Sequence, residues 1–149
     1  ARDGEQGRSE ITAAFLAAQM DAAEDITARR LAIWERYHAW AAPHEAAGRL
    51  IRPTIPAHTT HNAHMYYMLL PSLDARTHFI QSLREQGVQA VFHYIPLHSS
   101  PAGLSHGRTG SSMQVTDELS ERLVRMPLWI GVEQHLDAIL AAADRVLMG

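Results

Sequence analysis

The 149-residue sequence contains neither cysteine nor lysine. Without cysteine there is no disulfide, no thiolate nucleophile and no thiolate metal ligand, and a cysteine-free chain fits a reducing compartment. Without lysine, all 13 basic residues are arginines, and an arginine stays protonated and cannot act as an amine nucleophile. Chemistry that needs a lysine Schiff base is therefore closed to this chain by itself.

The sequence also lacks a basic excess and a long apolar run. Its 13 basic and 16 acidic residues give a net charge of −3, and the arginines are scattered apart from Arg29 and Arg30. This argues against nucleic acid or an anionic membrane as the main partner, because either needs a basic patch. No apolar run reaches 18 residues and no signal-peptide pattern opens the chain, so we expect a cytoplasmic protein without a membrane span.

The length and the 46% hydrophobic content predict one domain with its own core. Residues 1–8 form a polar N-terminal extension, and residues 9–149 form the single domain. That domain divides into a long helix within 9–48 and a small body at 49–149. The polar, glycine-containing start fits either a frayed terminus or a piece cut from a longer chain.

Apolar residues recur at three- and four-residue steps over 9–42, which predicts a long helix with Ser9 as its N-cap. A helix of this length exceeds the diameter of a small domain. We therefore expect part of it to project toward another domain or subunit. The alternative, which helix-length statistics support, is a kink or break near residues 25–27.

The rest of the chain alternates between strand and helix patterns. The expected elements are a central strand at 64–71, a helix at 73–87 with Asp74 as N-cap and Gly87 as stop, a strand at 88–94, a Ser/Gly-rich loop at 99–115, a capped helix at 116–125, a strand at 126–130 and a helix at 132–148. This order predicts an α/β or α+β domain, with a small sheet covered by helices.

A site-like segment reads VFHYIPLHSSPAG and places His93, Tyr94 and His98 on a loop stiffened by two prolines. Polar groups on such a loop at a strand end are often functional. From spacing alone, a structural histidine and a core aromatic are the commoner interpretation. No neighbouring acid completes a triad, and no G-x-S-x-G, P-loop or G-x-G-x-x-G motif is present.

Ten histidines raise the question of a metal site. His58, His61 and His64 recur every third residue, but Pro56 disfavours a helix there and a strand would alternate them between faces. No H-E-x-x-H pattern accompanies them. We expect scattered surface histidines and no metal site.

Several segments together resemble one known family. NAHMYYMLL, VFHYIPLHSSPAG and ELSERLVRMPLW follow a long helix and precede a closing helix. This ordered set resembles the C-terminal part of the DegT/DnrJ/EryC1/StrS sugar aminotransferases, and within them the TDP-4-keto-6-deoxy-D-glucose transaminases. The resemblance covers about residues 9–148.

The resemblance implies the small C-terminal domain of fold-type-I pyridoxal-phosphate enzymes, with a largely antiparallel sheet, covering helices and a long linking helix. It implies that pyridoxal 5′-phosphate and its lysine belong to an N-terminal domain missing from this chain, and that the active site forms in a homodimer. It makes His93, Tyr94 and His98 substrate-binding residues, whose imidazoles and phenol would contact the oxygens of a nucleotide sugar. It implies no catalytic, cofactor-binding or metal-binding residue in the chain itself.

The chain departs from the family pattern just before Ser9. The family usually has Asn or Ser and Tyr or Arg near the partner's cofactor phosphate, where this chain has Glu5, Gln6 and Gly7. A carboxylate there would repel a phosphate. Either residues 1–8 are out of register with the family or the contact is lost.

Three interpretations stay open at the level of sequence. The chain is the small domain of a nucleotide-sugar aminotransferase, inactive alone; or a stand-alone, non-catalytic module that binds a nucleotide sugar or dimerises; or a domain without a ligand. If it is cut from a parent, the surface left exposed should be apolar and self-associate through Ile11, Phe15 and Ala18.

Overall fold

The computed structural model describes the backbone of residues 3–149 and the side chains from Glu10 onward. Two helices take the place of the single long helix expected: α1 spans Asp3–Met20 and α2 spans Ala23–Ala46. Helix α1 begins before Ser9, so Ser9 lies inside it and is not its N-cap. Of the expected extension at 1–8, residues 1 and 2 lie outside the described residues and the others are helical.

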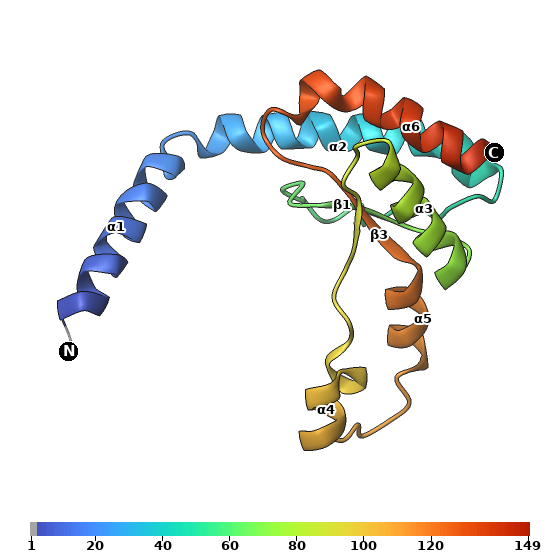
Figure 1. Cartoon of the computed structure of the whole chain (residues 1–149). Helices are drawn as coiled ribbons and strands as arrows, with labels where there is room; N and C mark the ends of the chain where they lie inside the picture. The colour runs from blue at the N-terminus through green and yellow to red at the C-terminus, as the bar shows by residue number, and fades with distance from the viewer. Residues whose placement is uncertain (1–2) are drawn as a thin grey trace.

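The break between the two helices falls at Asp21 and Ala22, earlier than the alternative position at 25–27. Residues 10–25 are all exposed, so no core contact requires a straight helix there. Burial begins with Ile33 and recurs at Trp34, Tyr37 and Ala41. Figure 1 shows α1 extending away from the body of the molecule while α2 lies beside it.

The sheet has three antiparallel strands: β1 (Tyr66–Leu69), β2 (Val91–Phe92) and β3 (Leu123–Met126). Their order is β1-β3-β2, with Tyr66 opposite Met126 and Val91 opposite Arg125. The largely antiparallel sheet implied by the resemblance is therefore confirmed. Strand β1 was expected at the centre, and this is wrong: β3 is central, and a single bridge from Ile51 to Leu69 borders β1 on its other side.

The helices that follow the sheet strands are shorter and more numerous than expected. Helix α3 (Leu73–Glu85) agrees with the prediction at 73–87, but Ser72 rather than Asp74 caps it: the Ser72 Oγ accepts from the Ala75 N–H at 3.1 Å. The loop expected at 99–115 contains the last residue of the 3₁₀ helix η1 (Leu97–Ser99) and all of α4 (Pro101–His106). The strand expected at 126–130 is wrong, because α5 (Gln114–Arg122) ends early and β3 starts at Leu123.

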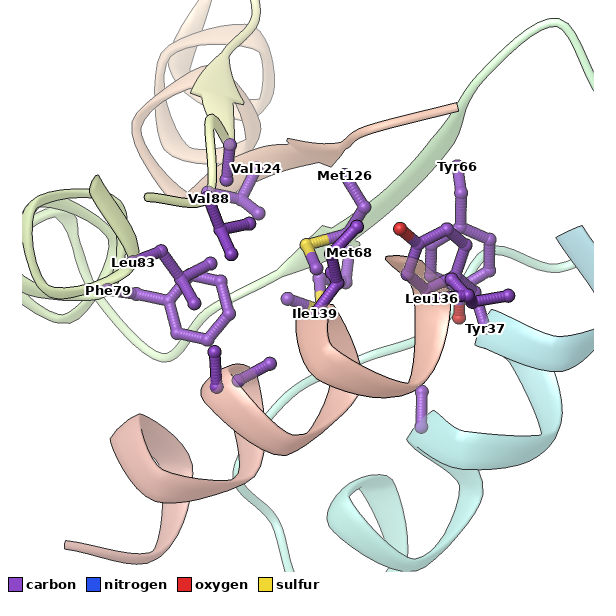
Figure 2. Packing of buried hydrophobic residues seen from close by; sticks show 14 of the residues in the cluster. Tyr37, Tyr66, Met68, Phe79, Leu83, Val88, Val124, Met126, Leu136 and Ile139 are labelled. Carbon is purple, nitrogen blue, oxygen red and sulfur yellow. The ribbon is translucent and has the colours of Figure 1, made fainter. Parts of the chain in front are cut away.

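The closing helix divides into η2 (Val132–His135) and α6 (Leu136–Met148) after Gly131, whose φ is +109°. One sheet face packs on α2, α3 and α6, and Figure 2 shows Met68 and Met126 beside Ile139 of α6 within this cluster. The Tyr37 ring stacks on Tyr66 at 5.2 Å, and its hydroxyl donates to the Pro127 carbonyl at 2.9 Å. This core fixes the sheet from which the candidate loop leaves.

Side chains on the opposite sheet face, from Tyr67, Leu69, Leu123 and Arg125, are only half-buried. Among the described residues, no helix is long and apolar enough to cross a membrane.

Candidate functional site

The candidate residues all lie on the connection between β2 and α5. Strand β2 ends at Phe92, so His93 and Tyr94 come directly after the sheet, and His98 follows in η1. In Figure 1 this connection runs from the sheet to α4, away from the helices that cover the core. The local fold follows from the sequence, because Pro96 and Pro101 precede and open the two short helices.

His93 and Tyr94 form a pair of rings. Their centroids are 4.7 Å apart, with an interplanar angle of 56°. Tyr94 is 76% exposed, so its phenol is open to a ligand or partner. The Nδ1 atom of His93 is buried and has no hydrogen-bond partner among the described residues. The pair therefore offers one open hydroxyl and one unused buried nitrogen.

His98 is held by a residue outside the loop. Its Nε2 lies 2.8 Å from Oδ1 of Asp117, in the first turn of α5. Because a carboxylate only accepts, the Nε2–H donates. The Asp117 side chain is partly exposed and that of His98 mostly buried. Only Nδ1 of this imidazole remains for a ligand.

An open cavity of about 1070 Å³ lies beside His98, between η1, α4 and the segment that leads to α5. His98 lines it, whereas His93 and Tyr94 do not. The residues that line it include Arg108 and four residues with hydroxyl groups: Thr109, Ser111, Ser112 and Thr116. Guanidinium and hydroxyl groups are suited to phosphate and sugar oxygens, and apolar residues such as Leu97, Leu104 and Met113 form much of the remaining lining.

Gly103 is required for the wall of this cavity. A Cβ atom built on Gly103 would lie 1.7 Å from the Leu97 carbonyl oxygen, which is backbone and cannot turn away. The Gly103 N–H also donates to the Ser100 Oγ at 3.0 Å, which caps α4. The glycine thus allows η1 and α4 to pack closely.

A second polar cluster lies on α2, away from the loop. His38 stacks on Trp34 at 4.6 Å, and its Nδ1 is buried without a partner among the described residues. Burial lowers the pKa of His38, Arg52 and His61 lower it further, and Glu45 opposes them. Hydrogen bonds from the Arg52 backbone and side chain lower the pKa of the Glu45 carboxyl. This cluster ties the chain after α2 to that helix.

The histidines considered for metal binding do not gather. Among the side chains that the structure describes, from Glu10 onward, there is no group of three or more histidine and carboxylate side chains placed to hold a metal ion. His61 packs against the Trp34 ring at 4.5 Å, and the His64 carbonyl accepts from Arg30 at 2.6 Å.

Sequence reasoning missed Arg108 and Asp117. Arg108 could have been identified from the sequence, since it is the one Asp, Glu, Lys or Arg residue in the Ser/Gly-rich stretch 99–115. Asp117 was not, because it lies 19 residues from His98 and only the fold of α4 and α5 brings the two together. No local pattern signals such a pair.

The family model for the DegT/DnrJ/EryC1/StrS aminotransferase family matches residues 6–142. A short stretch of 56 residues is 41% identical to the uncharacterized protein MJ1066 of Methanocaldococcus jannaschii. That stretch covers 35% of this chain and 14% of MJ1066.

Two solved structures illustrate the fold. DesV of S. venezuelae, solved in complex with a ketimine intermediate, has a TM-score of 0.78 and 18% identity over 92% of this chain and 36% of its own. Spr1654 of Streptococcus pneumoniae, a provisionally assigned sugar aminotransferase solved in its PLP form, has a TM-score of 0.71 and 23% identity over 89% of this chain and 34% of its own. The chain therefore spans about a third of the length of these structures.

Proposed function

Because the chain belongs to the DegT/DnrJ/EryC1/StrS aminotransferase family, we propose that it is the C-terminal, substrate-side part of a sugar aminotransferase. The substrate we propose is a TDP-4-keto-6-deoxyhexose. The observation that supports this best is the cavity of about 1070 Å³ beside His98, with Arg108 and several hydroxyls in its lining. Its size is at the upper end of the range of small-molecule sites.

The cofactor implied by the family is pyridoxal 5′-phosphate, which acts as an electron sink when bound. The residues of this chain do not fit it, because the chain has no lysine to hold it as a Schiff base. We propose that the lysine and the cofactor pocket belong to polypeptide outside this chain. On this proposal the 149-residue chain does not transaminate alone.

The proposed role of the loop is recognition. The exposed Tyr94 hydroxyl can donate to a sugar or diphosphate oxygen, and Arg108 can pair with the diphosphate. His98 offers Nδ1 toward the ligand, since Asp117 occupies Nε2. His93 is the neighbour whose ring orients Tyr94.

The proposed partner is a second copy of the enzyme. Helix α1 extends from the body (Figure 1), and Ile11, Phe15, Leu16 and Met20 on it are 58–71% exposed. Apolar side chains this exposed on one helix mark a contact surface. We propose that α1 packs at the homodimer interface of the complete enzyme.

Calorimetric titration of the chain with thymidine diphosphate tests the recognition role. We expect measurable binding by the wild type, and weaker binding by Tyr94→Phe and Arg108→Gln, because each removes one donor. His78→Ala, an exposed change on α3, is the matched control and should bind like the wild type. Equal affinity in all four proteins would remove the loop and cavity from the site.

A stand-alone binding or dimerisation module is the second candidate, and the absence of lysine favours it. The gene sequence upstream of residue 1 separates the two. A continuous frame that encodes a lysine-bearing cofactor domain supports the aminotransferase. A start codon directly before residue 1 supports the module.

A further inference from the structure

The loop at 93–97 has few packing contacts of its own. Tyr94, Ile95 and Leu97 are 62–79% exposed. An exposed segment of this kind opens easily unless specific contacts restrain it. The contacts at its two ends therefore decide how well its side chains are placed.

The first end is held by Arg76 of α3. Its guanidinium carbon lies 5.3 Å from the centre of the Phe92 ring, directly before His93. Its Nη1 donates to the Ser120 carbonyl of α5 at 3.1 Å. A guanidinium over an aromatic face is attractive, so Arg76 joins the end of β2 to α5.

The second end is held by Asp117, also of α5, through the 2.8 Å hydrogen bond with His98. The turn around His98 is closed by its own bonds, since the Ser99 N–H and Ser100 N–H both donate to the Pro96 carbonyl at 3.1 Å. Holding His98 therefore holds the whole turn. The Ser120 Oγ donates to the Asp117 carbonyl at 2.9 Å, which joins the two restraints within one turn of α5.

We propose that Arg76 and Asp117 are positioning residues for the substrate loop, which they hold from both ends against α5. Asp117 also sets the orientation of the His98 imidazole, since the carboxylate takes the Nε2–H and leaves Nδ1 as the other ring nitrogen. This proposal rests on the proposed function for its consequence in binding. The restraint of the loop itself does not depend on any ligand.

The test compares four variants of the 149-residue chain with the wild type. Asp117→Ala and Arg76→Met each remove one restraint, and Asp117→Asn keeps an acceptor for the His98 Nε2–H. Glu121→Ala is the matched control, an exposed acid on the same helix. Amide hydrogen exchange over residues 93–100, the imidazole N–H signal of His98 in NMR spectra and the affinity for thymidine diphosphate are measured for each.

We expect Asp117→Ala to speed exchange in the loop, to abolish the protected N–H signal of His98 and to weaken nucleotide binding at least about fivefold. Asp117→Asn should keep loop exchange, the His98 signal and nucleotide affinity close to their wild-type values, because the hydrogen bond rather than the charge is needed. Arg76→Met should speed exchange at residues 93–95 and leave the His98 signal in place.

Unchanged loop exchange and an unchanged His98 signal in Asp117→Ala would overturn the proposal, as would the same changes in Glu121→Ala. If the wild type binds no nucleotide, the recognition role fails while exchange and the His98 signal still decide the positioning role. If Asp117→Ala loses its fold, Asp117→Asn and Arg76→Met decide the positioning role, and wild-type loop exchange in both would contradict it.

Discussion

At the residue scale, one carboxylate joins the first and last helices of the core. Asp144 Oδ1 accepts from Trp40 Nε1 at 2.8 Å and lies 2.7 Å from His44 Nε2. His44 is only 5% exposed. A buried donor without a partner is costly. Loss of this carboxylate would leave the Trp40 and His44 donors without an acceptor, so we expect it to contribute strongly to stability.

Asp144→Ala should therefore destabilise the fold by about 1–3 kcal/mol for each donor it leaves buried. Thermal unfolding should show a fall in Tm of several degrees. Asp137→Ala, which removes the exposed partner of Arg36, is the control and should change stability by less than about 1 kcal/mol. Equal shifts in the two variants would contradict the role given to Asp144.

His38 predicts a dependence of stability on pH. Its pKa is lowered in the folded state by burial, Arg52 and His61, so the unfolded chain binds the proton more readily. Stability should then fall as pH drops below about 6.5, the unfolded value. The lowered pKa of the Glu45 carboxyl should cause a separate loss of stability as the pH falls below about 4.5.

Urea unfolding at about pH 7.5 and about pH 5.5, on either side of the unfolded pKa of histidine, checks this sign. The wild type should be less stable at the lower pH, and His38→Gln should lose less stability between the two values. His78→Gln, on the exposed face of α3, serves as the control and should behave like the wild type. If His38→Gln lost as much stability between the two pH values as the wild type does, His38 would not be the cause of the pH dependence.

At the element scale, residues close in sequence were enough to predict where helix α3 ends, and nearly enough to predict where it begins. Gly87 was expected to stop α3, and it follows the last helical residues with φ +78°. Asp74 was expected to cap the same helix, but the cap is two residues earlier at Ser72. Both are polar residues near the start of the helix, and only the backbone angles of Ser72, φ −151° and ψ 171°, single it out.

The cap predicts a matched pair of variants. Ser72→Ala should destabilise the protein by about 0.5–2 kcal/mol, because the Ala75 N–H loses its acceptor. Asp74→Ala should cost less, about 0.3–1 kcal/mol, since Asp74 only favours the helix dipole. Denaturant unfolding of the two proteins measures the difference. A larger loss in Asp74→Ala would show that the cap is misassigned.

The order of the strands in the sheet could not be predicted from the sequence, because strands distant along the chain pair with one another. The segment YYML is apolar at every position and suggested a central strand, whereas central β3 includes the polar Arg125. The apolar outward face of β1 instead remains half-buried. The candidate site shows the same limit. The sequence was enough to place His93, Tyr94 and His98 on one loop, whereas the contact between Asp117 and His98 forms only in the folded chain.

At the scale of the whole molecule, the shape of the chain has a consequence for association. Helix α1 stands apart from the body with Phe15 71% exposed, and its apolar side chains need a partner in water. Sedimentation velocity should show association that increases with concentration. Phe15→Glu should weaken it, and Ala17→Glu, the same charge on the side of α1 opposite Phe15, should weaken it less. A wild type that stays monomeric at high concentration would contradict this.

We propose that this chain recognises the nucleotide sugar of an aminotransferase without holding its cofactor. The most direct measurement is an NMR titration of the ¹⁵N-labelled chain with thymidine diphosphate. We expect saturable shifts at residues 93–98 and at the cavity residues around Arg108. Shifts confined to other surfaces, or none at millimolar nucleotide, would contradict it.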